Sequence, residues 1–296
     1  MCVFLTGSLL TGCFDPPAPP MFVMHDARPD TSLLGDGFDA PDATPYPTGV
    51  WSPPMLAFTA MTDDDPTLTD DLLEMYFNRA SDIYMVARTS TTSSWSTPVL
   101  VTELSSAQSE TTPEISGDGL TIFFASRRTP TAGAEDIWMA TRGSRMAAWN
   151  TPVHITELSS TTFDAAATPS ADGLSLVFYS DRSGTLEIYE TTRVVASDPW
   201  SQAVLHSELT SGIGEFDPML SPDKHTLYYD TSAAGGGDLY IATRTGTIGA
   251  FVTINPITEL NSPVDLEEDP WVSSDGHHMF FASNRDGMEG IYESSR

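Results

Sequence analysis

The stretch "TPEISGDGLTIFFAS" (Thr112–Ser126) holds two β-forming runs joined by an Asp-Gly pair. Such a pair between alternating apolar residues is the strongest short-range signal for a β-hairpin. The pattern returns as "AATPSADGLSLVFYS" (Ala166–Ser180), "DPMLSPDKHTLYYD" (Asp217–Asp230) and "DPWVSSDGHHMFFAS" (Asp269–Ser283), and stands earlier as "DPTLTDDLLEMYF" (Asp65–Phe77). The hairpin is therefore one part of a repeated unit.

The repeat has a period near 50 residues. Its turn aspartates lie 47, 54, 51 and 52 residues apart, at Asp71, Asp118, Asp172, Asp223 and Asp275. A period of this length indicates a propeller or a solenoid. Each hairpin is followed by a third β-rich segment, such as "EDIWMATR" (Glu135–Arg142), and a fourth, such as "WNTPVHITELSS" (Trp149–Ser160). Four short antiparallel strands per unit, with no helical periodicity, predict an all-β, five-bladed β-propeller.

The fifth unit reaches only its third strand, which ends at Arg296. The segment "WSPPMLAFTAMT" (Trp51–Thr62) carries the Trp-x-x-Pro of a fourth strand. We expect it to pair with the strand containing Gly290-Ile291-Tyr292, so that an N-terminal strand closes the ring and removes the exposed edges.

Arginine is distributed in register with the repeat. The chain has one lysine, Lys224, and twelve arginines, of which ten fall in the phrase after the hairpin: Arg79, Arg88, Arg127, Arg128, Arg142, Arg182, Arg193, Arg244, Arg285 and Arg296. Because a guanidinium pairs bidentately with a carboxylate, we expect one locked Asp–Arg pair in each repeat.

The phrases "DPMLSPD" followed by "LYY", "SDRSGTLEIY" and "SNRDG" resemble the WD-repeat-like propeller repeats of TolB, over residues 51–296. The resemblance implies a propeller of the bacterial periplasm. The TolB propeller has six blades and follows an α/β domain, whereas this chain has five units after a Pro-rich segment. A role in the Tol–Pal system is therefore not carried over.

The N-terminal segment predicts where in the cell the protein is located. Residues 3–10 form a short apolar run that leads into Leu10-Thr11-Gly12-Cys13. This resembles a bacterial lipobox, in which Cys13 is lipidated, and Phe14 rather than Asp at the next position favours the outer membrane. We assign residues 1–12 to a signal peptide, 13–50 to a Pro/Asp-rich tether and 51–296 to the propeller. The alternative for the first segment is an unstructured apolar tail.

The composition limits the partners. Forty-one acidic and 13 basic residues give a net charge of −28, which repels nucleic acid. Cys2 and Cys13 are the only cysteines, so neither a disulfide framework nor a zinc site is expected.

Asp-Pro at the start of the innermost strand should lie near the mouth of the central channel. We therefore name five candidate ligand-binding residues: Asp65, Asp217, Asp269, Glu267 and Glu268. They can hold Ca²⁺, pair with the arginines or cap turns. Function should also concentrate where the repeat is violated, at Asp230, Trp271 and the pair His277-His278. The histidines should point to opposite faces of their strand, which argues against one shared metal.

These features predict a monomeric, lipid-anchored propeller that acts as a binding scaffold for an envelope protein or a glycan. No Gly-x-Ser-x-Gly motif occurs, so a nucleophile elbow is not expected. The alternative function is a glycan-active hydrolase that uses two carboxylates at the channel mouth.

Overall fold

A computed structural model of the chain describes residues 47, 49–58, 62–131, 133–232 and 237–296. The chain divides into Met1–Gly35 and Asp36–Arg296, and every described residue belongs to the second part. The assignments of residues 1–12 and of Cys13 lie outside the described residues. The described part of the chain contains no helix long and apolar enough to cross a membrane.

Five four-stranded antiparallel sheets form the blades of a β-propeller, as the repeat predicted. The first blade consists of β2 (Asp63–Leu68), β3 (Glu74–Arg79), β4 (Asp82–Ala87) and β5 (Val99–Leu100). The second consists of β6 (Glu110–Ile115), β7 (Thr121–Ser126), β8 (Asp136–Thr141) and β9 (Val153–His154). The third consists of β10 (Asp164–Pro169), β11 (Ser175–Ser180), β12 (Glu187–Thr192) and β13 (Val204–Leu205).

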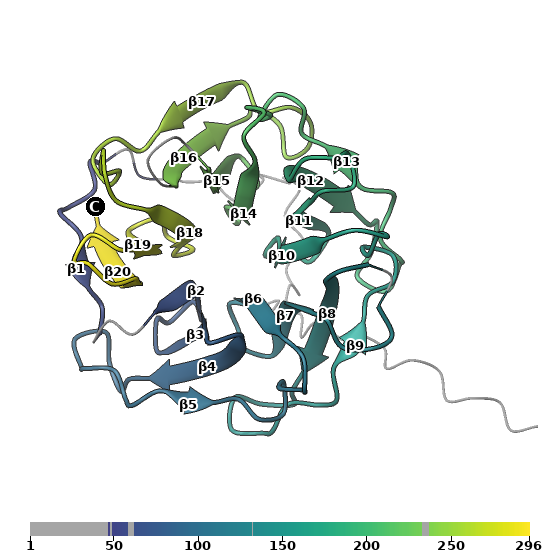
Figure 1. The fold of residues 1–296 in the computed structure, drawn as a ribbon, viewed down its shortest axis with the longest axis horizontal. Helices are drawn as coiled ribbons and strands as arrows, with labels where there is room; N and C mark the ends of the chain where they lie inside the picture. The colour runs from purple at the N-terminus through teal and green to yellow at the C-terminus, as the bar shows by residue number, and fades with distance from the viewer. Residues whose placement is uncertain (1–46, 48, 59–61, 132, 233–236) are drawn as a thin grey trace, which may run out of the picture. The chain divides into compact units, whose positions relative to one another are not determined.

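The fourth blade consists of β14 (Glu215–Leu220), β15 (Thr226–Thr231), β16 (Asp238–Thr243) and β17 (Thr253–Pro256). The fifth consists of β18 (Glu267–Val272), β19 (His278–Ser283), β20 (Gly290–Ser295) and β1 (Met55–Leu56). In Figure 1 the strands β2, β6, β10, β14 and β18 are innermost and surround the axis of the ring. Each blade therefore contributes its first strand to the centre of the ring.

The N-terminal strand closes the ring, which confirms the sequence prediction. Met55 lies opposite Glu293 and Leu56 opposite Tyr292. Trp51, just before β1, is 5% exposed and packs in the core between the fourth and fifth blades. This closure joins segments from the two ends of the propeller sequence, so that the fifth blade has its outer strand.

The hairpin turns have the geometry that Ser-x-Asp-Gly favours. Asp118 Oδ1 accepts hydrogen bonds from Ser116 Oγ (2.7 Å) and Leu120 N (2.9 Å). Gly119 has a φ of +74°, in the left-handed region that glycine enters without strain. The same aspartate contacts recur at Asp71, Asp172, Asp223 and Asp275. These side chains fix the turns, which assigns them a structural role.

The arginines in register fall into two main groups. One group ends the third strand of each blade and lies over the aromatic ring before the fourth, with 4.1–4.6 Å from guanidinium carbon to ring centroid: Arg88–Trp95, Arg142–Trp149, Arg193–Trp200, Arg244–Phe251 and Arg296–Trp51. The other group pairs with the acid that begins the innermost strand, in four of the five blades: Arg79–Asp63, Arg128–Glu110, Arg182–Asp164 and Arg285–Glu267. Arg127 pairs with Glu135 instead. The fourth blade lacks a pair at that position, but its Arg244 pairs bidentately with Glu190 of the third blade (2.6 and 3.0 Å).

Candidate functional site

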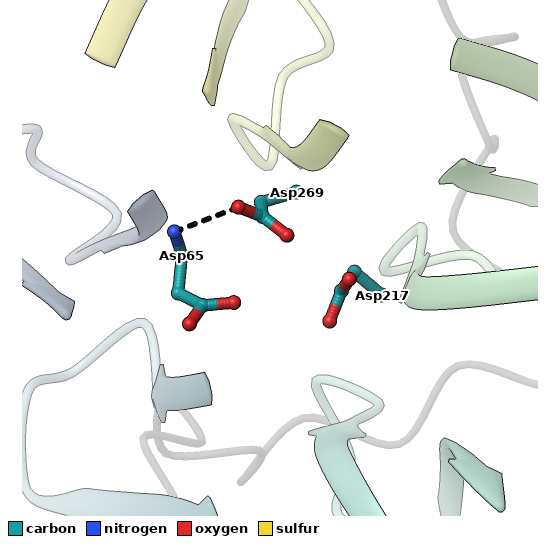
Figure 2. Close-up of side chains that lie close together, drawn as sticks. All are labelled: Asp65, Asp217 and Asp269. Carbon is teal, nitrogen blue, oxygen red and sulfur yellow. Dashed lines mark hydrogen bonds between the residues drawn. The ribbon is translucent and has the colours of Figure 1, made fainter. Parts of the chain in front are cut away.

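All five innermost strands bend at the same position. The strand register shifts there, and the residue at the bend has a positive φ in every blade: Asp65 (53°), Thr112 (44°), Ala166 (49°), Asp217 (43°) and Asp269 (56°). Non-glycine residues rarely adopt this conformation, which costs on the order of 1–2 kcal/mol per residue. Bulges of this kind re-aim side chains. Figure 2 shows Asp65, Asp217 and Asp269 pointing toward one another.

A relay of hydrogen bonds connects the bends of successive blades. Asp269 Oδ2 accepts from the amide of Asp65 (3.0 Å), and Asp65 Oδ2 accepts from the amide of Thr112 (3.1 Å). Thr112 Oγ1 accepts from the amide of Ala166 (3.1 Å). Each side chain therefore satisfies an amide that the bend removes from the strand ladder. Alanine has no acceptor, so this relay cannot continue from Ala166 to the fourth blade.

Asp230 of β15 replaces Asp217 as the acceptor at the fifth blade. The amide of Asp269 donates to Asp230 Oδ1 (3.3 Å). Among the described residues, no N–H or O–H group donates to the buried Asp217 Oδ1, while the carboxyl group of Asp217 lies within hydrogen-bond reach of Asp269 and Asp230. Asp217 Oδ1 is therefore an acceptor that a cation or a shared proton can satisfy. The sequence analysis named Asp230 because it departs from the repeat. In the structure this aspartate accepts the hydrogen bond from the amide of Asp269.

Asp65, Asp217 and Asp269, which we call the axial carboxylates, each offer an oxygen within 4.8 Å of the other two. Each faces the axis and is only partly exposed. Burial, followed by repulsion from Asp269, raises the pKa of Asp65 and of Asp217 well above the usual range. The pKa of Asp269 is raised by burial and held back by hydrogen bonds from its neighbours. Three ionised carboxylates at this spacing need a positive charge or shared protons.

Two further acids extend the acidic region beside the axial carboxylates. Burial and the nearby Asp269 raise the pKa of Asp64 to about 8 and that of Glu268 to about 11. Asn78 Nδ2 donates to Asp64 Oδ1 (2.6 Å), and Glu268 lies beside Glu289. The predicted residue Glu268 is thus close to the axial carboxylates without being one of them.

Glu267 lies in a different environment from the other candidates. Its side chain is 0% exposed and accepts from Arg285 Nη2 (2.9 Å) and Ser283 Oγ (3.0 Å). A carboxylate already paired with a guanidinium has a structural role in its blade. The structure therefore brings together Asp65, Asp217 and Asp269, with Glu268 adjacent, and does not bring Glu267 into the group.

The remaining sequence candidates are structural. Trp271 is 6% exposed and packs against Phe280 at 6.1 Å between ring centroids. His277 Nδ1 lies 2.7 Å from the carbonyl oxygen of Arg296, and His278 Nδ1 lies 3.1 Å from Glu293 Oε1. The two histidines therefore contact separate partners.

Sequence reasoning missed Glu114 as a member of the inner region. Thr67 Oγ1 donates to Glu114 Oε2 (3.3 Å), and burial raises the pKa of Glu114 to about 8. Glu114 stands two residues after the bend, where the other blades have Thr67, Thr168, Met219 and Trp271. Its charge at an otherwise uncharged repeat position was the signal that could have identified it.

No protein-family model matches the chain. No curated protein is a detectable relative. Among solved structures, an endo-arabinase from Bacteroides thetaiotaomicron is 13% identical, with a TM-score of 0.61 and coverage of 81% of this chain and 95% of that one. An α-L-arabinofuranosidase from Podospora anserina in complex with cellotriose is 10% identical, with a TM-score of 0.57 and coverage of 80% and 91%. A protein described as TolB from Agrobacterium tumefaciens is 16% identical, with a TM-score of 0.50 and coverage of 76% and 70%. At these identities the likeness establishes only that the chain shares a β-propeller fold with a TolB protein, an endo-arabinase and an α-L-arabinofuranosidase.

Proposed function

We propose that the protein is a binding scaffold of the bacterial envelope whose axial carboxylates hold a hard divalent cation such as Ca²⁺. The observation that carries the proposal is the convergence of one oxygen each from Asp65, Asp217 and Asp269 within 4.8 Å, where no N–H or O–H group of the described residues donates to the buried Asp217 Oδ1. A buried acceptor without a donor is costly, and a bound cation removes that cost.

The spacing suits a single ion. Because Ca²⁺–oxygen distances are about 2.4 Å, two oxygens on opposite sides of one ion lie roughly 5 Å apart. The axial oxygens fall within that limit. Carboxylate oxygens from three blades, completed by water, are the hard ligands that Ca²⁺ prefers. A cation there would also tie the first, fourth and fifth blades together at the axis.

The envelope location and the scaffold role rest on other observations. The lipobox-like segment ending at Cys13 supports a lipid anchor in the outer membrane. The fold shared with a TolB protein supports the same compartment. A propeller offers two loop-lined faces on a rigid ring, which suits the binding of an envelope protein or a glycan.

The second candidate function is hydrolysis of a glycan such as arabinan, by analogy with the endo-arabinase that shares the fold. Retaining glycosidases keep their two carboxyl groups about 5–5.5 Å apart, and inverting ones about 6.5–9.5 Å, with the sugar between them. Here one oxygen from each axial carboxylate lies within 4.8 Å of the other two, a convergence that a single ion can bridge, and Asp269 also accepts from the amide of Asp65.

Calorimetric titration of chelator-treated protein with CaCl₂ tests the proposal. We expect one saturable site, with affinity at least tenfold weaker in Asp217→Asn, because the variant loses one anionic ligand. Asp70→Asn, at an exposed aspartate, is the matched control and should bind as the wild type does. Absence of Ca²⁺ binding by the wild type, together with arabinan hydrolysis that Asp269→Asn abolishes, would replace the proposal with the second candidate.

A further inference from the structure

Four blades contain the same guanidinium site, formed by the innermost acid and two aromatic rings. In the second, third and fifth blades the arginine Nε donates to the serine that ends the second strand, at 3.0–3.1 Å: Arg128 to Ser126, Arg182 to Ser180 and Arg285 to Ser283. In all four blades the guanidinium carbon lies 4.9–5.3 Å from the centroids of both rings. The site thus consists of a carboxylate, a hydroxyl in three blades and an aromatic pair.

The fourth blade has the site without the arginine. Its acid is Glu215, its hydroxyl is that of Thr231, and its rings are Tyr229 and Tyr240, stacked at 5.6 Å and 28°. The ring geometry matches that of the third blade, 5.9 Å and 26°. The sequence from Thr231 to Asp238 reads "TSAAGGGD" and supplies no Lys or Arg.

The two acceptors that an arginine would occupy receive no hydrogen bond from an N–H or O–H group of the described residues. Glu215 is 0% exposed, and its Oε1 accepts from Ser211 N (2.7 Å), but none of these groups donates to its Oε2, and the carboxyl group of Glu187 lies within hydrogen-bond reach. Thr231 is 4% exposed, and its Oγ1 likewise has no partner within the described part of the chain. Burial and the neighbouring Glu187 raise the pKa of Glu215. In the second, third and fifth blades the guanidinium contacts both equivalent groups, and in the first blade it contacts the acid.

In the four blades that have the arginine, its side chain is 14–24% exposed, while the acid that it pairs with is at most 1% exposed. In these blades the arginine therefore reaches a buried acid from the surface of the blade. A net charge of −28 favours the approach of a basic segment.

We propose that the fourth blade binds an arginine side chain presented by a partner polypeptide. The guanidinium donates to Glu215 Oε2 and Thr231 Oγ1 and lies over Tyr229 and Tyr240, as the chain's own arginines do in the other blades. Arginine suits this site better than lysine because its planar group pairs with a carboxylate and stacks on aromatic rings at the same time. The inference does not depend on the axial carboxylates.

The test uses the peptide acetyl-Gly-Arg-Gly-amide as the probe, with the uncharged citrulline peptide of the same shape as its control. We expect saturable binding of the arginine peptide to the wild type, at least tenfold tighter than that of the citrulline peptide, by heteronuclear NMR titration. Glu215→Gln should weaken binding at least tenfold. Ala233→Arg, which places an arginine two residues after Thr231 as in Arg285 after Ser283, should abolish binding and raise the melting temperature.

Arg285→Ala provides the positive control, because it creates the same empty site in the fifth blade. Peptide binding to Arg285→Ala at a new site, with none to the fourth blade of the wild type, would overturn the proposal. If Arg285→Ala does not fold, equal binding by wild type, Glu215→Gln and Ala233→Arg overturns it instead. Tighter binding of free L-arginine than of the peptide would contradict a polypeptide partner. Asp217→Asn should bind the peptide normally, so failure of the Ca²⁺ proposal is distinguishable.

Discussion

Replacement of Arg182 by alanine should destabilise the whole propeller. Arg182 Nη2 pairs with Asp164 Oδ1 at 2.5 Å and donates to the carbonyl oxygen of Leu158 at 2.7 Å. Its guanidinium carbon lies 4.9 Å from the ring of Phe178 and 5.0 Å from that of Tyr189. Asp164 is 0% exposed, so the substitution leaves a buried carboxylate without its cation.

Breaking a buried pair from one side costs about 3–5 kcal/mol, and partial exposure of the arginine reduces this through solvent screening. We therefore expect a loss of about 3 kcal/mol, which corresponds to a decrease in melting temperature of roughly 6–12 °C for a domain of this size. Urea unfolding followed by tryptophan fluorescence measures the loss directly.

Arg127→Ala is the matched control. The Arg127 side chain is 56% exposed, and it contacts Glu135 at 3.3 Å. Glu135 is itself buried, but its contact with Arg127 is longer and the guanidinium is largely exposed to solvent, so screening limits the contribution of this pair to about 1 kcal/mol or less. Arg145 is unsuitable as a control, because it pairs with both Asp71 and Glu74. Equal unfolding midpoints for Arg182→Ala and Arg127→Ala would refute the structural role of the arginines in register.

Three further predictions follow from the sequence and the structure. Expression of the full chain should place it in the membrane fraction, and Cys13→Ser should release it; membrane association unchanged by the substitution would exclude the anchor. Deletion of residues 1–62 removes β1 (Met55–Leu56) from β20 and should lower the melting temperature strongly, whereas deletion of residues 1–45 should not; equal melting temperatures would contradict the role of closure. In chelator, the free energy of unfolding should fall between about pH 4 and pH 8, because burial and Asp269 raise the folded-state pKa of Asp64 to about 8 while the unfolded chain releases that proton near pH 4. Asp64→Asn should reduce this fall, and an identical pH profile for the variant would show that Asp64 does not cause it.

The sequence by itself determined the blade and the number of blades. Local signals carry that information: Asp-Gly turns between alternating apolar residues, and a period near 50 residues that repeats five times. The unfinished fifth unit and the Trp-x-x-Pro at Trp51 even predicted that β1 would complete the last blade. These features follow from local backbone preferences, which short stretches of sequence determine, and from the need to pair the exposed edge of the last blade.

Only the tertiary structure decided which acids meet. The positive φ at Asp65, Asp217 and Asp269 comes from the bend and not from the residue type, since Thr112 and Ala166 adopt it at the same position of their blades. This bend aims the three carboxylates at one point (Figure 2). Glu267 pairs with an arginine, whereas Glu215, at the same position of the fourth blade, does not. This difference depends on contacts between strands of each blade. Aspartates 204 residues apart, such as Asp65 and Asp269, interact because the ring closes. The energy of interaction between two charges depends on the distance between them in space, and their separation in the sequence does not give that distance.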